Sequence, residues 1–358
     1  MSLNNNCCEQ HLKVSDVAFA ILHSAVFETF AILNHNNQEF RILSVRKRHL
    51  KGLLVSAIVV LLLWGASFLP RVGLWSFQTA TAAIAWWYDF ETRQVALGDI
   101  TFSVYVRPGR DTAATPVVLL HGYTANKALW LPMAAQLDSS ATIIIPDLAG
   151  HGETGFDPQW SYRASAQAQR LQRLFAALQI EQPVLVGHSM SGLIAANFAL
   201  LYPQQLSALI VMNPTGVTSP TPSRAEKLLQ QGRSPFLIND WQDFQELYQL
   251  SMAQPPWIPN FIQRGVAYDY RQHKAEFSQI AEDFLYHDQL DQRLSELQIP
   301  TLILWGAEDA LIDVSSADVW HSAIQGSEVV VLEQVGHMPM LERPRQTADE
   351  LQRFLKRY

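Results

Sequence analysis

The sequence predicts an α/β fold built on a mainly parallel sheet. From about residue 93 onward, short apolar runs alternate with segments of helical periodicity. Most of these runs are apolar at every position, as expected of strands that are buried on both faces of a parallel sheet. The helical segments between them are long enough to connect one parallel strand to the next. We therefore expect helices on both faces of the sheet.

Ahead of this domain, residues 45–75 contain a basic flank and an apolar run. No charged residue interrupts the 17 residues from Leu53 to Leu69, which is the short end of what can span a bilayer core. Four cations precede the run, and the positive-inside rule then predicts that the N-terminus is cytoplasmic and that the residues after the run are extracytoplasmic. We expect an uncleaved single-pass transmembrane helix, followed by a linker over 76–91. A cleaved signal peptide is the alternative, with the alanine-rich "TATAAIA" as its processing region.

Residues 1–44 fit this organisation poorly. Their weaker apolar stretch, 17–33, is broken by polar residues. Val45 directly precedes the basic cluster, and a valine codon can serve as a bacterial start. We hypothesise that residues 1–44 precede the true start, the alternative being a second membrane or interfacial helix.

Eight segments are predicted as strands. "RQVALG" and "ITFSVYV" are adjacent and read as an antiparallel pair. The other six are "PVVLL", "ATIIIPD", "QPVLVG", "SALIVMN", "PTLILWG" and "EVVVLE". Helices are expected from about Lys127 and at 161–179, 190–202, 314–325 and 344–357. These elements assign 92–213 and 298–358 to the sheet domain.

The strand series is interrupted between residues 214 and 297. Amphipathic helical pieces occur at 224–231, 240–252 and 273–289, and the prolines of "QPPWIPNF" (254–261) favour a rigid, non-helical backbone. We predict a helical cap inserted after the sixth strand. Its apolar side chains either line a substrate channel or pack the cap onto the sheet; the candidates for substrate binding are Phe236, Trp257, Ile258 and Phe261.

Composition excludes several functions. The net charge is −7, with +3 in residues 1–75 and −10 in the remainder, so nothing favours nucleic acid as a partner. The two cysteines, Cys7 and Cys8, are adjacent, which excludes a disulfide framework and a thiolate metal site in the rest of the chain. No metal or organic cofactor and no protein partner is implied.

The stretch "VLVGHSMSGL" (185–194) contains two serines that could act as nucleophile. A serine on a sharp strand-to-helix turn needs small residues two positions before and after it. Ser189 has Gly187 and Ser191 at these positions, whereas Ser191 would have Leu193, which is too large. Ser189 is therefore the predicted nucleophile, with Ser191 as a tolerated replacement for glycine.

A serine hydroxyl needs a base, and the base needs an orienting carboxylate. Asp309 and His337 each follow a predicted strand, at the same sheet edge as Ser189. Glu308 and Asp313 are rival acids, whose alternative roles are a solvated loop charge and a helix cap. Asn213, where some hydrolases place the acid, is uncharged. The predicted oxyanion donors are the backbone N–H groups of Met190 and Tyr123.

The motifs "LLHGYTANKALW", "PDLAGHGET", "LVGHSMSGL", "LWGAEDALIDVSSAD" and "VGHMPMLERPRQTA" together resemble the α/β-hydrolase superfamily. Over residues 92–358 the sequence looks closest to membrane-anchored monoacylglycerol lipases and related bacterial lipase/esterases. The resemblance implies a Ser189–Asp309–His337 triad and an oxyanion hole at Tyr123 and Met190. The departure is Ser191 in place of glycine.

We therefore expect a serine ester hydrolase whose substrate is a lipid or small ester, such as a monoacylglycerol, met at a membrane. Two other functions stay open. A carbon–carbon bond hydrolase of aromatic degradation shares the triad and the cap, but has little reason to be membrane-tethered. A ligand-binding receptor could keep the fold without catalysis. Haloalkane dehalogenases and epoxide hydrolases are disfavoured because they place aspartate at the position of Ser189.

Overall fold

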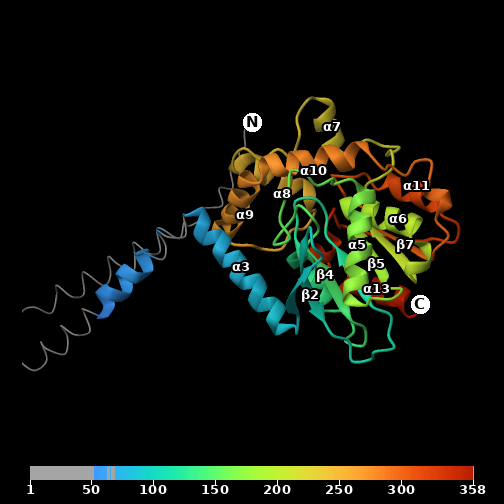
Figure 1. Cartoon of the computed structure of the whole chain (residues 1–358). Helices are drawn as coiled ribbons and strands as arrows, with labels where there is room; N and C mark the ends of the chain where they lie inside the picture. The colour runs from blue at the N-terminus through green and yellow to red at the C-terminus, as the bar shows by residue number, and fades with distance from the viewer. Residues whose placement is uncertain (1–51, 63–64, 66–68, 358) are drawn as a thin grey trace, which may run out of the picture. The chain divides into compact units, whose positions relative to one another are not determined.

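The computed structural model describes residues 52–62, 65 and 69–357, in two units that divide after residue 65 (Figure 1). In the first unit, residues 52–62 are helical and their apolar side chains are exposed. Among the described residues, no helix is both long and apolar enough to cross a membrane. The predicted anchor, 53–69, lies only partly within the described residues, and the whole of 1–44 lies outside them.

The second unit is built on one eight-stranded sheet, as predicted. The strand order is β1-β2-β4-β3-β5-β6-β7-β8. Strand β2 is antiparallel to both of its neighbours, and the other pairs are parallel. The strands are β1 (Glu91–Ala96), β2 (Thr101–Arg107), β3 (Val117–Leu120), β4 (Ile143–Pro146), β5 (Val184–His188), β6 (Ala208–Met212), β7 (Thr301–Gly306) and β8 (Glu328–Leu332).

Helices cover both faces of the sheet. Strand β3 shows why, because Val118 and Leu120 point into one core while Val117 and Leu119 point into the other. The first core is closed by α5 (Ala164–Leu178), α6 (Met190–Leu201) and α11 (Ser315–Ala323). The second is closed by the 3-10 turn η1 (Lys127–Trp130) and the helices α4 (Leu131–Ala134), α12 (Pro339–Glu342) and α13 (Pro344–Leu355).

The segment between β6 and β7 is a helical cap. It contains α7 (Arg224–Gln230), α8 (Trp241–Ser251), α9 (Asn260–Gln272) and α10 (Lys274–Tyr286). Helix α9 is not predicted from the sequence, because the prolines before it indicate irregular backbone. The backbone is irregular only up to Pro259, which has φ −53° and forms the N-cap of α9. A helix can begin directly after proline, whose fixed φ suits the first turn.

Most of the predicted linker over 76–91 is helical. Helix α3 (Pro70–Trp87) joins residues assigned to the anchor and to the linker, and its alanine-rich part favours helix. It packs against α9 with backbone contact: a Cβ at Gly73 would lie 1.9 Å from the Phe261 carbonyl oxygen, and one at Gly265 would lie 2.0 Å from the Leu74 nitrogen. Figure 1 shows α3 running past α9, beside the cap.

Candidate active site

Ser189 lies on a strained turn between β5 and α6. Its backbone has φ 55° and ψ −120°, a region that residues with a side chain rarely adopt. The Ser189 N–H donates to the Met212 carbonyl at 3.0 Å, which helps hold the turn against the next strand. The surrounding structure thus keeps a partly exposed hydroxyl at the carboxyl edge of the sheet.

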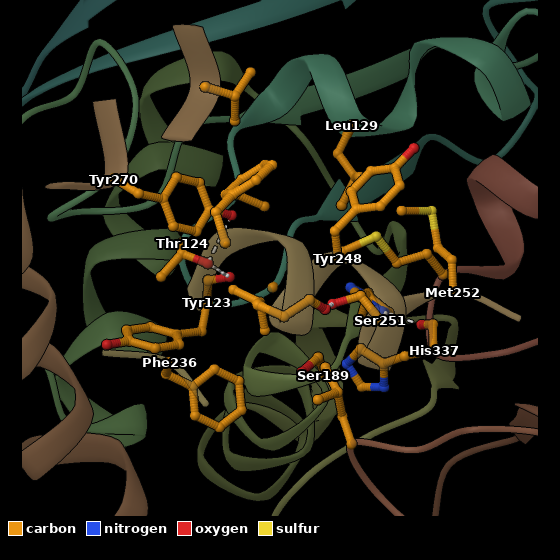
Figure 2. A pocket seen from close by; sticks show the side chains of 18 of the residues that line it. Tyr123, Thr124, Leu129, Ser189, Phe236, Tyr248, Ser251, Met252, Tyr270 and His337 are labelled. Atoms are coloured by element: carbon orange, nitrogen blue, oxygen red, sulfur yellow. Dashed lines mark hydrogen bonds between the residues drawn. The ribbon is translucent and has the colours of Figure 1, made fainter. Parts of the chain in front are cut away.

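Ser191 is turned away from the cavity and into the protein. It is fully buried, and its hydroxyl donates to the Leu120 carbonyl at 2.6 Å and accepts the His188 N–H at 2.9 Å. The predicted steric limit also holds, since a Cβ at Gly187 would lie 2.1 Å from the Ser191 carbonyl oxygen. Ser189, not Ser191, faces the cavity described below (Figure 2).

His337 and Asp309 form a buried pair. His337 Nδ1 lies 2.7 Å from Asp309 Oδ2, which also accepts the Asn213 side-chain amide at 2.7 Å. Asp309 Oδ1 accepts the backbone N–H groups of Leu311 at 2.8 Å and Ile312 at 3.0 Å. Four hydrogen bonds therefore fix the carboxylate, and its bond to Nδ1 leaves Nε2 of the imidazole as the atom that can accept a proton.

The rival acids lie in other surroundings. Glu308 is exposed, and the Asp313 carboxylate accepts the N–H of Ser315 at the start of α11, at 3.0 Å. His188 is a positioning group rather than a base: its Nε2–H donates to the His337 carbonyl at 2.8 Å. Burial lowers the pKa of His188 well below its ordinary value, so the ring is neutral.

The two predicted oxyanion donors flank the serine turn. Met190 is the first residue of α6, where backbone N–H groups have no acceptor within the helix. Tyr123 follows β3 in a loop that closely approaches the nucleophile, since a Cβ at Gly122 would lie 3.1 Å from that of Ser189. The Tyr123 side chain reaches the cap, where its hydroxyl donates to the Phe277 carbonyl at 2.8 Å.

A cavity of about 370 Å³ lies between the sheet edge and the cap. Ser189, His337 and Phe236 are part of its wall (Figure 2), and so is Ile258. The two other cap residues predicted to bind substrate are not: the Trp257 side chain is 86% exposed, and Phe261 packs beside α3. The whole stretch 254–261 was expected to be non-helical, but α9 begins within it, at Asn260.

Sequence reasoning missed one wall of this cavity, which is formed by Leu74, Phe77 and Gln78 of α3. These residues are spaced three and four positions apart, as one face of a helix requires. The signal was present, but the apolar run directly before it led us to divide the region between an anchor and a linker.

Sequence reasoning also missed Glu342, a buried carboxylate at the end of α12. Its oxygens accept the Gly336 N–H at 3.0 and 3.1 Å and the Met338 N–H at 3.3 Å, on both sides of His337. Glu342 also accepts the N–H of Gln254, three residues beyond the end of α8, at 2.8 Å. The His337 N–H in turn donates to the carbonyl of Ser251 in α8, at 3.1 Å. One carboxylate thus ties the histidine loop to the cap.

The comparisons with known proteins agree with this fold. The sequence pattern of the alpha/beta hydrolase fold matches residues 115–344, and the chain belongs to that family. Within this family, its similarity to lipases identifies the chain as a hydrolase of the lipase/esterase type. Lipase 1 of Psychrobacter immobilis is 30% identical over 270 residues, which cover 74% of this chain and 84% of the lipase.

Two further relatives cover more of the chain. Monoacylglycerol lipase ABHD6 of Homo sapiens is 28% identical over 316 residues, covering 83% of this chain and 91% of that protein. Among solved structures, a membrane phospholipase A described as a bacterial virulence factor is 31% identical, with a TM-score of 0.74 over 87% of this chain and 98% of its own. A 2-hydroxy-6-oxo-6-phenylhexa-2,4-dienoate hydrolase from Rhodococcus, at 19% identity and TM-score 0.64, shares the fold.

Proposed function

We propose that the protein hydrolyses carboxylic esters through an acyl-enzyme on Ser189. The observation that carries the proposal is the hydrogen-bonded His337–Asp309 pair, which shares a cavity with a serine held on a strained turn. Ser189 Oγ attacks the ester carbonyl while His337 Nε2 takes its proton, and Asp309 stabilises the imidazolium. The N–H groups of Tyr123 and Met190 stabilise the oxyanion.

The alcohol then leaves with the proton that His337 carries. In the second half, His337 Nε2 takes a proton from a water molecule that attacks the acyl-enzyme, and then returns it to Ser189 Oγ as the acid leaves. Every proton in this cycle moves between oxygen atoms and His337 Nε2.

The preferred substrate class is a single-chain amphiphilic ester, such as a monoacylglycerol. Apolar side chains of α3 and the cap, among them Phe77, Phe236 and Ile258, offer an acyl chain a surface beside Ser189. Burial of each methylene is worth about 0.8 kcal/mol, so kcat/KM rises from acetate towards chains of about eight carbons. Triacylglycerols are poorer substrates because three chains crowd a capped site.

A fluorophosphonate probe with an ester panel tests this proposal. Ser189→Ala abolishes labelling and lowers kcat by about 10⁴-fold, and Asp309→Asn lowers kcat by orders of magnitude in a folded protein. Glu308→Gln is the matched control and keeps wild-type rates. Full activity in Ser189→Ala or Asp309→Asn would refute the assignment. Turnover of ring-cleavage diketones without ester hydrolysis would replace it with carbon–carbon bond cleavage.

We also propose that residues 53–69 anchor the chain in a membrane, with the N-terminus cytoplasmic and the catalytic domain on the extracytoplasmic side. The uncharged run and the four cations before it support this proposal. The full-length protein is expected to stay with membranes after carbonate extraction, because apolar burial holds it. Its release by carbonate, or protection of the catalytic domain from protease added outside spheroplasts, would overturn the anchor or its orientation.

A further inference from the structure

Helix α3 has an outward face that carries no charge beyond Arg71 in its first turn. Between Val72 and Tyr88 there is no Asp, Glu, Lys or Arg. Trp75 and Trp86, eleven residues apart and therefore on the same side of the helix, are 66% and 75% exposed. Ala82 lies on the same side, as does Thr79, whose hydroxyl is used within the helix in a 2.8 Å bond to the Trp75 carbonyl. This outward face is thus apolar along its length.

Another face of α3, which begins beside the outward one, closes the cavity. Leu74, Phe77 and Gln78 line the space that contains Ser189, and the contact of Gly73 with α9 holds the helix against the cap. The same helix therefore has the candidate active site on one face and an uncovered apolar surface on another.

The occupant that suits this surface is a lipid bilayer. Exposed apolar faces of this kind mark interaction sites, and tryptophan rings favour the boundary between headgroups and acyl chains. In the sequence, α3 begins at Pro70, directly after the apolar run that ends at Leu69. A chain that leaves a bilayer at that point delivers α3 to its surface. A protein partner usually meets a polar rim with charged groups, and between Val72 and Tyr88 this helix offers no charged side chain.

We propose that the outward face of α3, defined by Trp75, Ala82 and Trp86, lies in the headgroup region of the bilayer and that esters of that leaflet enter the cavity beside it. The lipid contact is independent of catalysis. The entry of esters rests on the proposed hydrolase function.

Site-directed fluorescence on the full chain tests the lipid contact. In a Cys7→Ser/Cys8→Ser background, Trp75→Cys or Trp86→Cys is labelled with the environment-sensitive dye NBD and reconstituted in phosphatidylcholine/phosphatidylglycerol vesicles. Lipids that carry a nitroxide near the headgroup are expected to quench both labels by about twofold or more. The control is Val331→Cys, which is 41% exposed on β8, at the far end of the sheet from β1; its label stays unquenched.

Two results would overturn the lipid contact. Labels at 75 and 86 that remain in water and unquenched would leave the face without a bilayer. Labels that are shielded yet unquenched, and that cross-link between copies of the chain, would assign the face to a second protein molecule.

Kinetics test the entry of substrate. The double variant Trp75→Gln/Trp86→Gln is expected to hydrolyse a long-chain monoacylglycerol in vesicles about tenfold more slowly and to hydrolyse soluble p-nitrophenyl acetate at the wild-type rate. Val331→Gln is the control and changes neither rate. Equal rates for the double variant and the wild type on vesicles would contradict entry beside α3 while leaving the hydrolase intact. If the wild-type protein hydrolyses no ester at all, the proposed function is refuted, and the entry of esters with it. The lipid contact measured by quenching would not be affected.

Discussion

Ser191 shows how a departure from a sequence motif can be accommodated by hydrogen bonds. Its side chain fills the position where glycine is usual, and its hydroxyl joins the end of β3 to the end of β5. Both partners, the Leu120 carbonyl and the His188 N–H, belong to buried residues. A buried polar group that loses its partner costs about 1–3 kcal/mol, so this serine contributes to the stability of the turn.

Ser191→Gly is accordingly expected to separate stability from catalysis. The free energy of unfolding falls by about 1–3 kcal/mol because two buried backbone groups lose their partner. The kcat of the folded protein stays within about tenfold of wild type, since Ser189 keeps its small neighbours. Urea unfolding and p-nitrophenyl ester kinetics measure the two effects. A loss of activity as large as that of Ser189→Ala would show that Ser191 takes part in the chemistry.

Glu342 is expected to position the catalytic base. In Glu342→Gln, one carboxylate oxygen becomes an amide that donates, and it then faces a backbone N–H. We expect kcat to fall about 10- to 100-fold on all esters with little change in KM, because His337 shifts while the cavity wall remains. The pH profile of kcat/KM also moves, which a loss of stability alone would not cause. Glu333→Gln, at an exposed position before the histidine loop, is the control; equal effects in both variants would contradict the assignment.

At the residue scale, the sequence was sufficient for positions and insufficient for contacts. Ser189, Asp309 and His337 could be named because each follows a predicted strand, and parallel strands end at one edge of the sheet. The pairing of Glu342 with Gln254 joins positions 88 residues apart, and no periodicity in a single sequence reports such a contact. Trp257 shows the same limit. The apolar, proline-rich stretch around it suggested a cavity wall, but its side chain points outward.

At the scale of elements, long periodic segments were predicted well and the region around the cavity was not. The central strands, β3 to β7, follow from apolar runs that burial on both faces requires. Helix α3 was not predicted, because an apolar run directly precedes it. Its sequence is compatible with the end of an anchor and with an amphipathic helix, and only the packing against α9 distinguishes the two. The cavity wall therefore depends on a helix pair that is formed by tertiary packing.

Helix α3 leads to a prediction for the selectivity between short and long acyl chains. Phe77→Ala removes an aromatic side chain from the cavity wall, so kcat/KM for an octanoate ester falls about tenfold or more relative to the acetate ester. Trp257→Ala is the matched control, because its ring is exposed and should leave the profile unchanged. The measurement is kcat/KM over a series of p-nitrophenyl esters. A flattened profile in Trp257→Ala, with none in Phe77→Ala, would move the acyl site to the proline-rich stretch.

At the scale of the whole molecule, stability depends on histidines that fold as neutral rings. His121 and His151 lie in the loops after β3 and β4, with ring centroids 5.2 Å apart. His121 Nε2 accepts the Leu148 N–H at 3.0 Å, which joins the two loops. Burial lowers the pKa of His121 to about 4 and that of His151 to about 3. Neither ring can be protonated near neutral pH without losing its place in the fold.

Acid is therefore expected to destabilise the protein well above the pH at which carboxylates titrate. An unfolded histidine has a pKa of about 6.5, so below that pH the unfolded state binds more protons than the folded state and the free energy of unfolding falls as the pH is lowered. Between pH 7 and pH 5 each of these two histidines contributes a loss of about 2 kcal/mol, and the loss continues until the pH reaches the folded pKa. Urea unfolding of the full chain in detergent at the two pH values measures this loss in the free energy of unfolding.

His151→Gln should be less stable at pH 7 but should lose about 2 kcal/mol less than wild type on acidification. An unfolding free energy that is equal at pH 7 and pH 5 would mean that these rings are protonated in the folded protein, which their burial argues against.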